Sequence, residues 1–294
     1  MQIPALQQTL GRYQQWKARV AQALLELERW LTDHRRATPR ARERLKSALE
    51  RIRRDRLTLA LVGEPSRGVS ELINALFFAD LGGRLLPAAV GPQCPTELLW
   101  DELRDEAYLR LLPLESRALG LSLAALRADP RHWVHYPLNV RVPEQMAGTL
   151  REIQQTRAVA PPEAGRFGLG GGGQAAAPRF EVAKWRYAIV SLPHALLRQG
   201  LVIQTIPGSS VLAQEPDLAT TLIPAAQAVL LVLAADEASI RSDLELWQPY
   251  LKDLRSDRQR PTLVGLNRVD LLWERLRDAA AIEGAVAELR KTTA

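Results

Sequence analysis

Cysteine is nearly absent from this sequence, since Cys94 is the only cysteine in 294 residues. A single cysteine cannot form an internal disulfide, and it cannot supply a cluster of thiolate metal ligands. We therefore expect a reducing, cytosolic setting for this chain and no metal site built on cysteine.

Long apolar runs are missing as well. The longest one, "LIPAAQAVLLVLAA" at 222–235, is too short to span a bilayer and is better explained by a helix end followed by a buried strand. The N-terminus lacks the apolar core and cleavage site of a signal peptide. We therefore expect any membrane contact of this chain to be peripheral.

Positive charge is present in excess but is unevenly spread. The formal net charge is +6, and much of the excess lies in "DHRRATPRARERLKSALERIRRDR" at 33–56. A basic helical stretch can meet anionic lipid, nucleic acid or an acidic partner, and it can also be an ordinary solvated helix face. The solvated face is the interpretation we favour, and because no aromatic residues interleave with the arginines and no reading motif is present, we expect no specific nucleic-acid partner.

The first 56 residues predict a helical hairpin. Apolar residues recur in steps of three and four over 5–32, which is typical of one stripe of a long helix. A second helix is predicted over 39–56, beginning at Pro39, a favourable first-turn residue. Two such stripes need a partner to bury them, so we assign residues 1–56 to part of a helical bundle or stalk.

The hydrophobic period changes after residue 56. Short apolar runs ending in turn residues predict strands at 57–63, 201–208, 228–236 and 261–267, and a helix is predicted at 70–80. Alternation of strands and helices predicts an α/β fold with a mostly parallel sheet flanked by helices, preceded by the long N-terminal hairpin. Ligand chemistry is expected at the C-terminal ends of such strands.

A segment of low complexity interrupts this pattern. Residues 161–178, "PPEAGRFGLGGGGQAAAP", are rich in proline, glycine and alanine. This composition is typical of a flexible surface loop, which we place at about 159–179.

Residues 63–70, "GEPSRGVS", resemble a phosphate-binding loop between a strand and a helix. The pattern G-x-x-x-x-G-K-[ST] is matched by Gly63, Gly68 and Ser70, while Val69 stands where the lysine belongs. The backbone N–H groups of such a loop cradle phosphate oxygens, and its final hydroxyl reaches Mg²⁺. Ser70 is therefore a candidate metal ligand.

Three further pieces follow in chain order. "CPTE" contains Thr96, which we place in a segment between the first helix and the next strand, where its hydroxyl can close over a metal and a terminal phosphate. "QTIPG" ends at Gly208, and "LNRVD" carries Asn267 and Asp270 at another strand end. The spacing of the last pair suits a carboxylate that accepts hydrogen bonds from guanine.

Together, "LALVGEPSRGVSELINALFFAD", "CPTELLWD", "GLVIQTIPG" and "LVGLNRVDLLW" resemble the four guanine-nucleotide motifs of bacterial dynamin-like GTPases. The resemblance covers about residues 57–275. It implies a dynamin-type G domain over 57–294 that is incomplete at its C-terminus. It also implies self-association or pairing with a related dynamin-like protein, and membrane remodelling. The location it implies is cytoplasmic, with peripheral contact at the inner face of the membrane through the C-terminal part that we expect to be missing.

The resemblance assigns roles to residues of this chain, with GTP or GDP and Mg²⁺ as cofactors if the site is functional. Ser66 and Thr96 take the catalytic positions, and Ser70 and Thr96 the metal positions. The nucleotide-binding positions are Gly63, Arg67, Gly68, Val69, Ser70, Gly208, Asn267, Arg268 and Asp270.

The sequence departs from the family pattern at charged positions. Val69 replaces the loop lysine, and we align Gln204 with the aspartate of D-T-P-G; Arg268 replaces the lysine of N-K-x-D. A lysine near the phosphates contributes about 4 kcal/mol of attraction at about 4 Å and an effective dielectric constant of about 20. We therefore expect a degenerate member in which GTP hydrolysis is weak or absent. Two alternatives remain: an active GTPase in which Arg67 or a partner residue replaces the lysine, and a structural or nucleic-acid-binding protein.

Overall fold

The structure is a computed structural model. It describes residues 3–79, 85–88, 92–169, 179–208, 216–235, 240, 243–244, 247, 261–270, 272 and 278–293.

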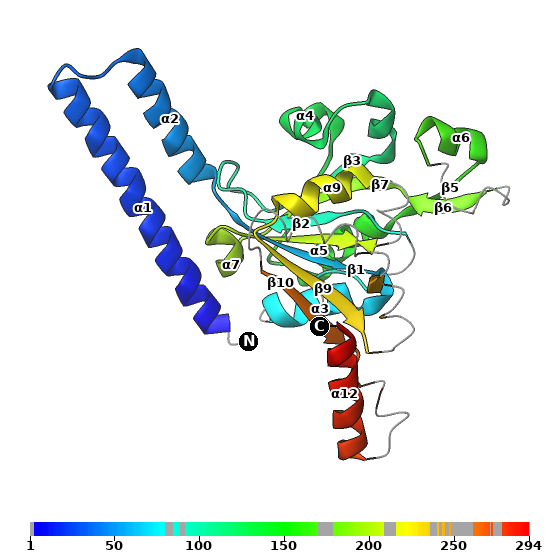
Figure 1. The fold of residues 1–294 in the computed structure, drawn as a ribbon. Helices are drawn as coiled ribbons and strands as arrows, with labels where there is room; N and C mark the ends of the chain where they lie inside the picture. Colours follow the sequence, from blue (N-terminus) through cyan, green and yellow to red (C-terminus); the bar gives the residue numbers. More distant parts are fainter. Residues whose placement is uncertain are drawn as a thin grey trace.

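The N-terminal hairpin consists of α1 (Ile3–Asp33) and α2 (Pro39–Arg54), as the two apolar stripes predict. Thr38 caps α2, since its hydroxyl accepts a hydrogen bond of 3.2 Å from the N–H of Ala41. Leu45 and Leu49 of α2 are buried, and α1 and α2 pack against each other. The hairpin projects from one end of the molecule (Figure 1).

An eight-stranded sheet forms the centre of the molecule, in the order β10-β9-β1-β8-β2-β7-β3-β4. The four strands from β10 to β8 are mutually parallel; β2 is antiparallel to β8 and parallel to β7, and β3 is antiparallel to both β7 and β4. The strands are β1 (Leu57–Gly63), β2 (Thr96–Leu99), β3 (Tyr108–Pro113), β4 (Val134–Pro137), β7 (Trp185–Ser191), β8 (Leu201–Pro207), β9 (Ala228–Ala234) and β10 (Thr262–Asn267).

The apolar runs correctly predict the four parallel strands β1, β8, β9 and β10. Because they are parallel, their C-terminal ends meet at one edge of the sheet, where Gly63, Pro207 and Asn267 lie. The antiparallel β2 begins at that edge with Thr96. The sequence pattern did not predict β2, β3, β4 or β7, which extend the sheet on one side.

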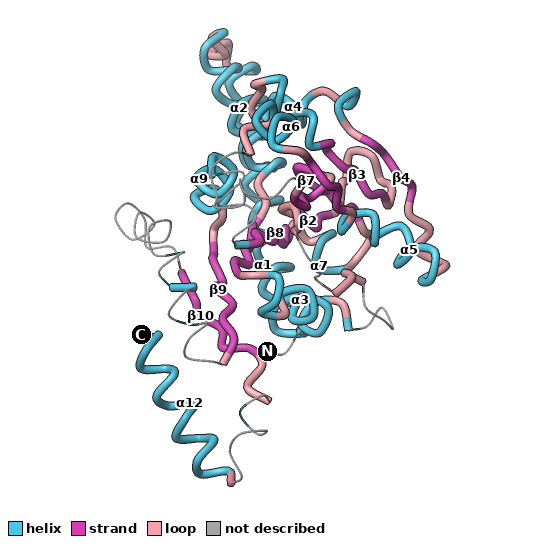
Figure 2. Tube along the Cα trace, turned by 90° about the vertical axis from the view of Figure 1, so that its right-hand side faces the viewer, coloured by secondary structure: helices cyan, strands magenta, loops and turns pink. Residues whose placement is uncertain are grey.

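Helices cover both faces of the sheet, and each face has its own apolar core (Figures 1 and 2). One face carries α3 (Val69–Phe77), α5 (Pro143–Leu150) and α7 (Ala195–Arg198), and Leu10 of α1 packs into the same core. The other face carries α4 (Leu123–Ala128) and α9 (Pro216–Ala225). The last helix of the chain, α12 (Ala279–Thr293), lies near β10 (Figure 2). None of the helices that the structure describes is long and apolar enough to cross a bilayer.

The segment predicted as a loop at 159–179 contains a helix in its described part. This helix is α6 (Pro161–Arg166), and it follows strand β5 (Thr156–Val159) in the chain. Strand β5 pairs with β6 (Phe180–Ala183) in a separate two-stranded sheet. The two prolines occupy the first positions of α6, where the missing N–H group costs nothing. Residues 170–178 lie outside the described residues.

Candidate functional site

The loop at 63–70, which we call the phosphate loop after the motif that it resembles, has the strand–turn–helix geometry that its sequence predicts. It leaves β1 at Gly63, passes through a short 3-10 helix (Pro65–Arg67) and enters α3 at Val69. Gly68 adopts φ +79°, a left-handed conformation that favours glycine. A Cβ atom on Gly63 would lie 2.7 Å from the carbonyl oxygen of Val232. Both glycines are therefore required by the backbone itself.

Val69 occupies the lysine position and lies in the core. Its side chain is 7% exposed, and it belongs to the apolar cluster between α3 and the sheet. One of its methyl groups lies 3.3 Å from where a Cβ on Gly63 would be. This position of the loop thus contributes apolar packing and no charge.

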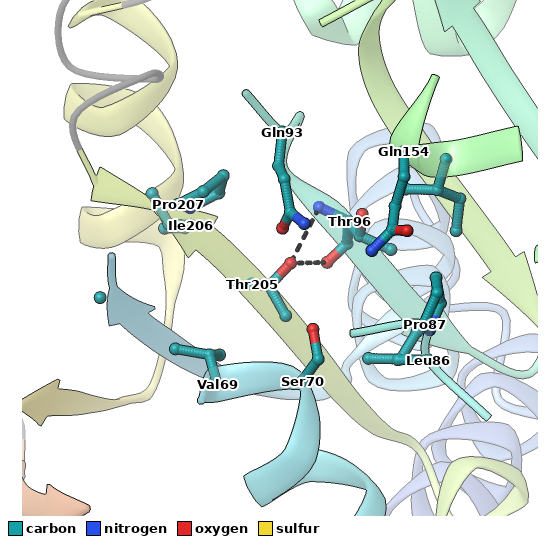
Figure 3. A pocket seen from close by; sticks show the side chains of 12 residues that line it. Val69, Ser70, Leu86, Pro87, Gln93, Thr96, Gln154, Thr205, Ile206 and Pro207 are labelled. Atoms are coloured by element: carbon teal, nitrogen blue, oxygen red, sulfur yellow. Dashed lines mark hydrogen bonds between the residues drawn. The ribbon is translucent and has the colours of Figure 1, made fainter. Parts of the chain in front are cut away.

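Hydroxyl groups converge at the mouth of the loop (Figure 3). Ser70 of α3, Thr96 of β2 and Thr205 of β8 line one small pocket. The N–H of Thr96 donates to Oγ1 of Thr205 over 3.2 Å, and that hydroxyl donates to the Thr96 carbonyl over 3.4 Å. Oγ1 of Thr96 itself donates to the Cys94 carbonyl over 3.3 Å.

Thr96 does not lie in a segment between the first helix and the next strand, as the sequence suggested. It is the first residue of β2, and its side chain is 4% exposed. Ladder bonds to β8 and β7 fix this residue, so its hydroxyl is held by the sheet. Beside it, burial raises the pKa of the Cys94 thiol to about 12, which keeps Cys94 neutral.

The alignment of Gln204 with the aspartate of D-T-P-G is wrong. Counted back from Gly208, the aspartate position is Thr205, and the side chains of β8 alternate between the two faces of the sheet. Thr205 pairs with Leu61 of β1 and faces the pocket, whereas Gln204 pairs with Ala60 and faces the opposite core. A hydroxyl, not an amide, therefore replaces the carboxylate.

Gln204 belongs to a buried polar network on that opposite face. Its Nε2 donates to the Tyr187 hydroxyl over 2.7 Å, and Arg127 reaches the same hydroxyl over 2.9 Å. Arg127 also pairs with Glu97 of β2. Burial raises the pKa of the Tyr187 hydroxyl, so it stays protonated and can donate to Glu97. This network is a structural element of the core.

The segment 85–88 closes the pocket from outside α3. Asn74 holds it with two hydrogen bonds of 2.8 Å, one from its Nδ2 to the Leu86 carbonyl and one from the Leu86 N–H to its Oδ1. We call this pair of bonds the Asn74 clamp. Nε2 of Gln154 donates to the Ala88 carbonyl from the other side.

The space between the described residues at this site is small. The pocket lined by Ser70, Thr96, Thr205, Leu86 and Pro87 has a cavity of about 30 Å³. Such a volume holds roughly one or two water molecules, whereas small-molecule sites measure about 300–1,000 Å³.

The donor set of the pocket does not suit Mg²⁺ and a triphosphate. Mg²⁺ is usually bound through carboxylates and phosphate oxygens, and the residues that line the pocket include no carboxylate and no cation. Among the described residues no group of three or more His, Cys, Asp or Glu side chains could hold a metal ion. The described residues that line this pocket therefore do not fit a magnesium–nucleotide complex in this arrangement.

Arg67 is the candidate substitute for the lysine, and its guanidinium group binds Asp243. Its Nε and Nη2 donate to the two carboxylate oxygens of Asp243 over 2.8 and 3.2 Å, and Asp243 is 3% exposed. Such a bidentate pair is strong and geometrically specific. Ser66, next to Arg67, is exposed and does not line the pocket. In this conformation Arg67 is paired with Asp243 and Ser66 lies outside the pocket, and the roles that the resemblance assigns to them stay predictions.

Of the fourth motif, "LNRVD", Asn267 contacts the phosphate loop. Nδ2 of Asn267 donates to the Arg67 carbonyl over 2.8 Å and to the Gly68 carbonyl over 3.4 Å, so it fastens the end of β10 to the loop. Arg268 follows with φ +57°, and Asp270 is exposed. Gly208, at the end of the third motif, packs against the Glu64 side chain.

Three contributors to the pocket escaped sequence reasoning: Thr205, Asn74 and Gln154. Counting back from Gly208 would have found Thr205. Asn74 lies one helical turn after Ser70, which places the two on one face of α3. No sequence signal connects Gln154, which is far along the chain, with this site.

Comparisons with known proteins give structural relatives only, since no family model and no curated protein matches this sequence. Two solved structures match over 98% of this chain, at 14% identity and with TM-scores of 0.51 and 0.50. Both come from work on an oligomerised bacterial dynamin pair described as a mechanism for the long-range sensing and tethering of membranes. The fold of this chain is dynamin-like.

The match is partial in length. This chain spans 36% and 35% of the two bacterial dynamin chains, about a third of each. At 14% identity the likeness concerns the fold, and it agrees with the arrangement of a dynamin-type G domain with helices before it.

Proposed function

We propose that this chain is a dynamin-like G-domain protein with a closed nucleotide pocket, which acts by association with a second copy or with a related dynamin-like protein in membrane remodelling. The single observation that carries the proposal is the pocket at the phosphate loop. Its cavity of about 30 Å³ is lined by Val69 and Thr205 where the motifs would place a lysine and an aspartate.

Electrostatics support this reading. A triphosphate carries several negative charges, and its binding normally depends on a lysine and on a carboxylate-held Mg²⁺. Val69 offers no charge, and Thr205 offers only a hydroxyl that is already bonded to Thr96. Since each 1.4 kcal/mol corresponds to about tenfold in affinity, losing both contributions lowers affinity for GTP by several orders of magnitude.

The proposed association is independent of nucleotide, which distinguishes it from that of an active GTPase. The dynamin-like neighbours are described as an oligomerised pair, which supports association as the mode of action. Sedimentation velocity over a range of protein concentrations, with and without a non-hydrolysable GTP analogue and Mg²⁺, tests this. We expect concentration-dependent assembly that the analogue leaves unchanged. A chain that assembles only with the analogue would contradict the proposal, and a chain that stays monomeric throughout would rule out its self-association and leave only pairing with a related dynamin-like protein.

A further inference from the structure

A cavity of about 770 Å³ lies between the base of the N-terminal hairpin and the sheet. Its walls come from α1, the C-terminal end of α2, the end of β2 with the turn that follows it, α4, and the connection from α7 to β8. We call it the hairpin cavity. Small-molecule sites measure about 300–1,000 Å³ and often lie where two structural units meet, so this cavity has the size and the place of a ligand site.

The hairpin cavity lies at the edge of the sheet opposite to the phosphate loop. Strand β2 runs antiparallel to β8, so it begins beside the phosphate loop with Thr96, which lines the small pocket there. It ends at the other edge with Leu99, which lines the hairpin cavity. The two sites are therefore separate, and no motif of the sequence assigns a ligand to the hairpin cavity.

An ion pair between Glu97 and Arg127 lines the cavity, with side chains that are 11% and 37% exposed. Only one atom of each partner makes the pair: Oε2 of Glu97 accepts from Nη2 of Arg127 and from the Tyr187 hydroxyl. No described residue bonds to Oε1 of Glu97 or to Nε and Nη1 of Arg127. The pair therefore offers an unused carboxylate oxygen and two unused groups of guanidinium donors side by side.

Apolar side chains line the same cavity; they are Leu99, Trp100, Leu103 and Leu197. Leu103 is 96% exposed, although the turn that carries it is fixed by Oδ1 of Asp101, which accepts a hydrogen bond of 3.2 Å from the Leu103 N–H. The turn thus holds an apolar side chain in water, and a ligand that covered it would gain the free energy of removing that surface from water.

We propose that the hairpin cavity binds a free α-amino acid with an apolar side chain. The ligand carboxylate accepts from Nε and Nη1 of Arg127, since a guanidinium fork matches a carboxylate, and the ligand ammonium donates to Oε1 of Glu97. An α-amino acid carries its two charges on neighbouring atoms, as the paired Glu97 and Arg127 require. Its side chain packs against the apolar residues of the lining.

The charge of the lining favours a zwitterion over an anion or a cation. Beyond the Glu97–Arg127 pair, the described lining carries three cations and three carboxylates; they are Lys17, Arg53, Arg56, Glu50, Asp55 and Glu102. Equal numbers of both signs give no net attraction for an ion of one sign, whereas a zwitterion can use both. The inference goes beyond the proposed function, because it concerns the edge of the sheet away from the phosphate loop.

The test is isothermal titration calorimetry of the chain with L-leucine and with three related compounds. Isocaproate lacks the ammonium, isoamylamine lacks the carboxylate, and ε-aminocaproate is an isomer of leucine with its charges at opposite ends. We expect saturable binding of L-leucine with a Kd below about 1 mM. Each of the other three should bind at least about tenfold more weakly, because a hydrogen bond to a charged group contributes about one to two orders of magnitude.

Two variants locate the site. Ala18→Trp fills the cavity from an exposed position of α1 and should abolish the binding of L-leucine. Its matched control, Ala23→Trp, adds the same side chain at an exposed position of α1 outside the cavity lining, and it should bind L-leucine within a few-fold of the unaltered chain. In Glu97→Gln, L-leucine should bind no more tightly than isocaproate. Circular dichroism checks that each variant remains folded.

Four results would overturn the proposal: no saturable binding of L-leucine, equal binding of ε-aminocaproate, unchanged binding in Ala18→Trp, or equal loss in Ala23→Trp. Nucleotide titration and sedimentation are separate readouts, so failure here leaves the proposed function untouched.

Discussion

At the scale of single residues, the direction of a side chain decides what a motif can do. Thr205 and Gln204 are neighbours, yet Thr205 points to the phosphate loop and Gln204 to the core behind the sheet. The spacing from Gly208 contains this information, because it fixes the aspartate position at Thr205. The loop glycines Gly63 and Gly68 could also be predicted, since only glycine fits their turn. The pairing of Arg67 with Asp243 could not, because nothing local links residues so far apart in sequence.

A matched pair of aspartate variants checks these directions. Gln204→Asp would place a carboxylate in the core near Glu97 and remove the bond to Tyr187, so we expect a loss of about 3 kcal/mol in the free energy of unfolding. Thr205→Asp points into the pocket beside Ser70 and should cost less than about 1.5 kcal/mol. Urea unfolding measures both. Equal losses for the two variants would show that the assignment of faces is wrong.

At the scale of elements, the sequence predicted the helices and strands whose apolar residues recur with a strong period, and it missed the strands in which that period is weak. Long stripes predicted α1 and α2, and apolar runs predicted β1, β8, β9 and β10. The four strands β2, β3, β4 and β7 are shorter or carry charge in the core. In β3 the buried Arg110 lies over the Trp133 ring, 5.1 Å from its centroid, and breaks the apolar pattern. The burial of Arg110 could not be predicted from the sequence, because it depends on how α4 and the segment around Trp133 pack on the sheet.

At the same scale, the Asn74 clamp holds the segment 85–88 beside the pocket, and its removal should release that segment. In Asn74→Ala the N–H and carbonyl of Leu86 lose their partners in a buried site, at a cost of about 2–4 kcal/mol. We expect hydrogen exchange of the Leu86 amide to accelerate by at least about tenfold. The control is Gln22→Ala, which removes an exposed side-chain bond on α1. Unchanged exchange at Leu86 would mean that other contacts hold the segment.

At the scale of the whole molecule, the pocket lies where the parallel strands end. The N-terminal hairpin projects from one end of the molecule (Figure 1). The sequence predicted the α/β class and the hairpin, because both follow from local periodicity. The order of strands and the size of the pocket depend on how Leu86, Gln154 and Thr205 meet, and these contacts join segments that no local pattern relates.

The most direct test of the central claim is titration of a fluorescent GTP analogue with Mg²⁺ into the unaltered chain, beside the variant Val69→Lys, Thr205→Asp, Asn74→Ala. This variant supplies the lysine and the aspartate and releases the segment over the pocket. The account predicts no saturable binding by the unaltered chain at micromolar analogue and a gain of at least about tenfold in the variant. Saturable micromolar binding by the unaltered chain would contradict a closed pocket and would show that the site accepts nucleotide without the lysine.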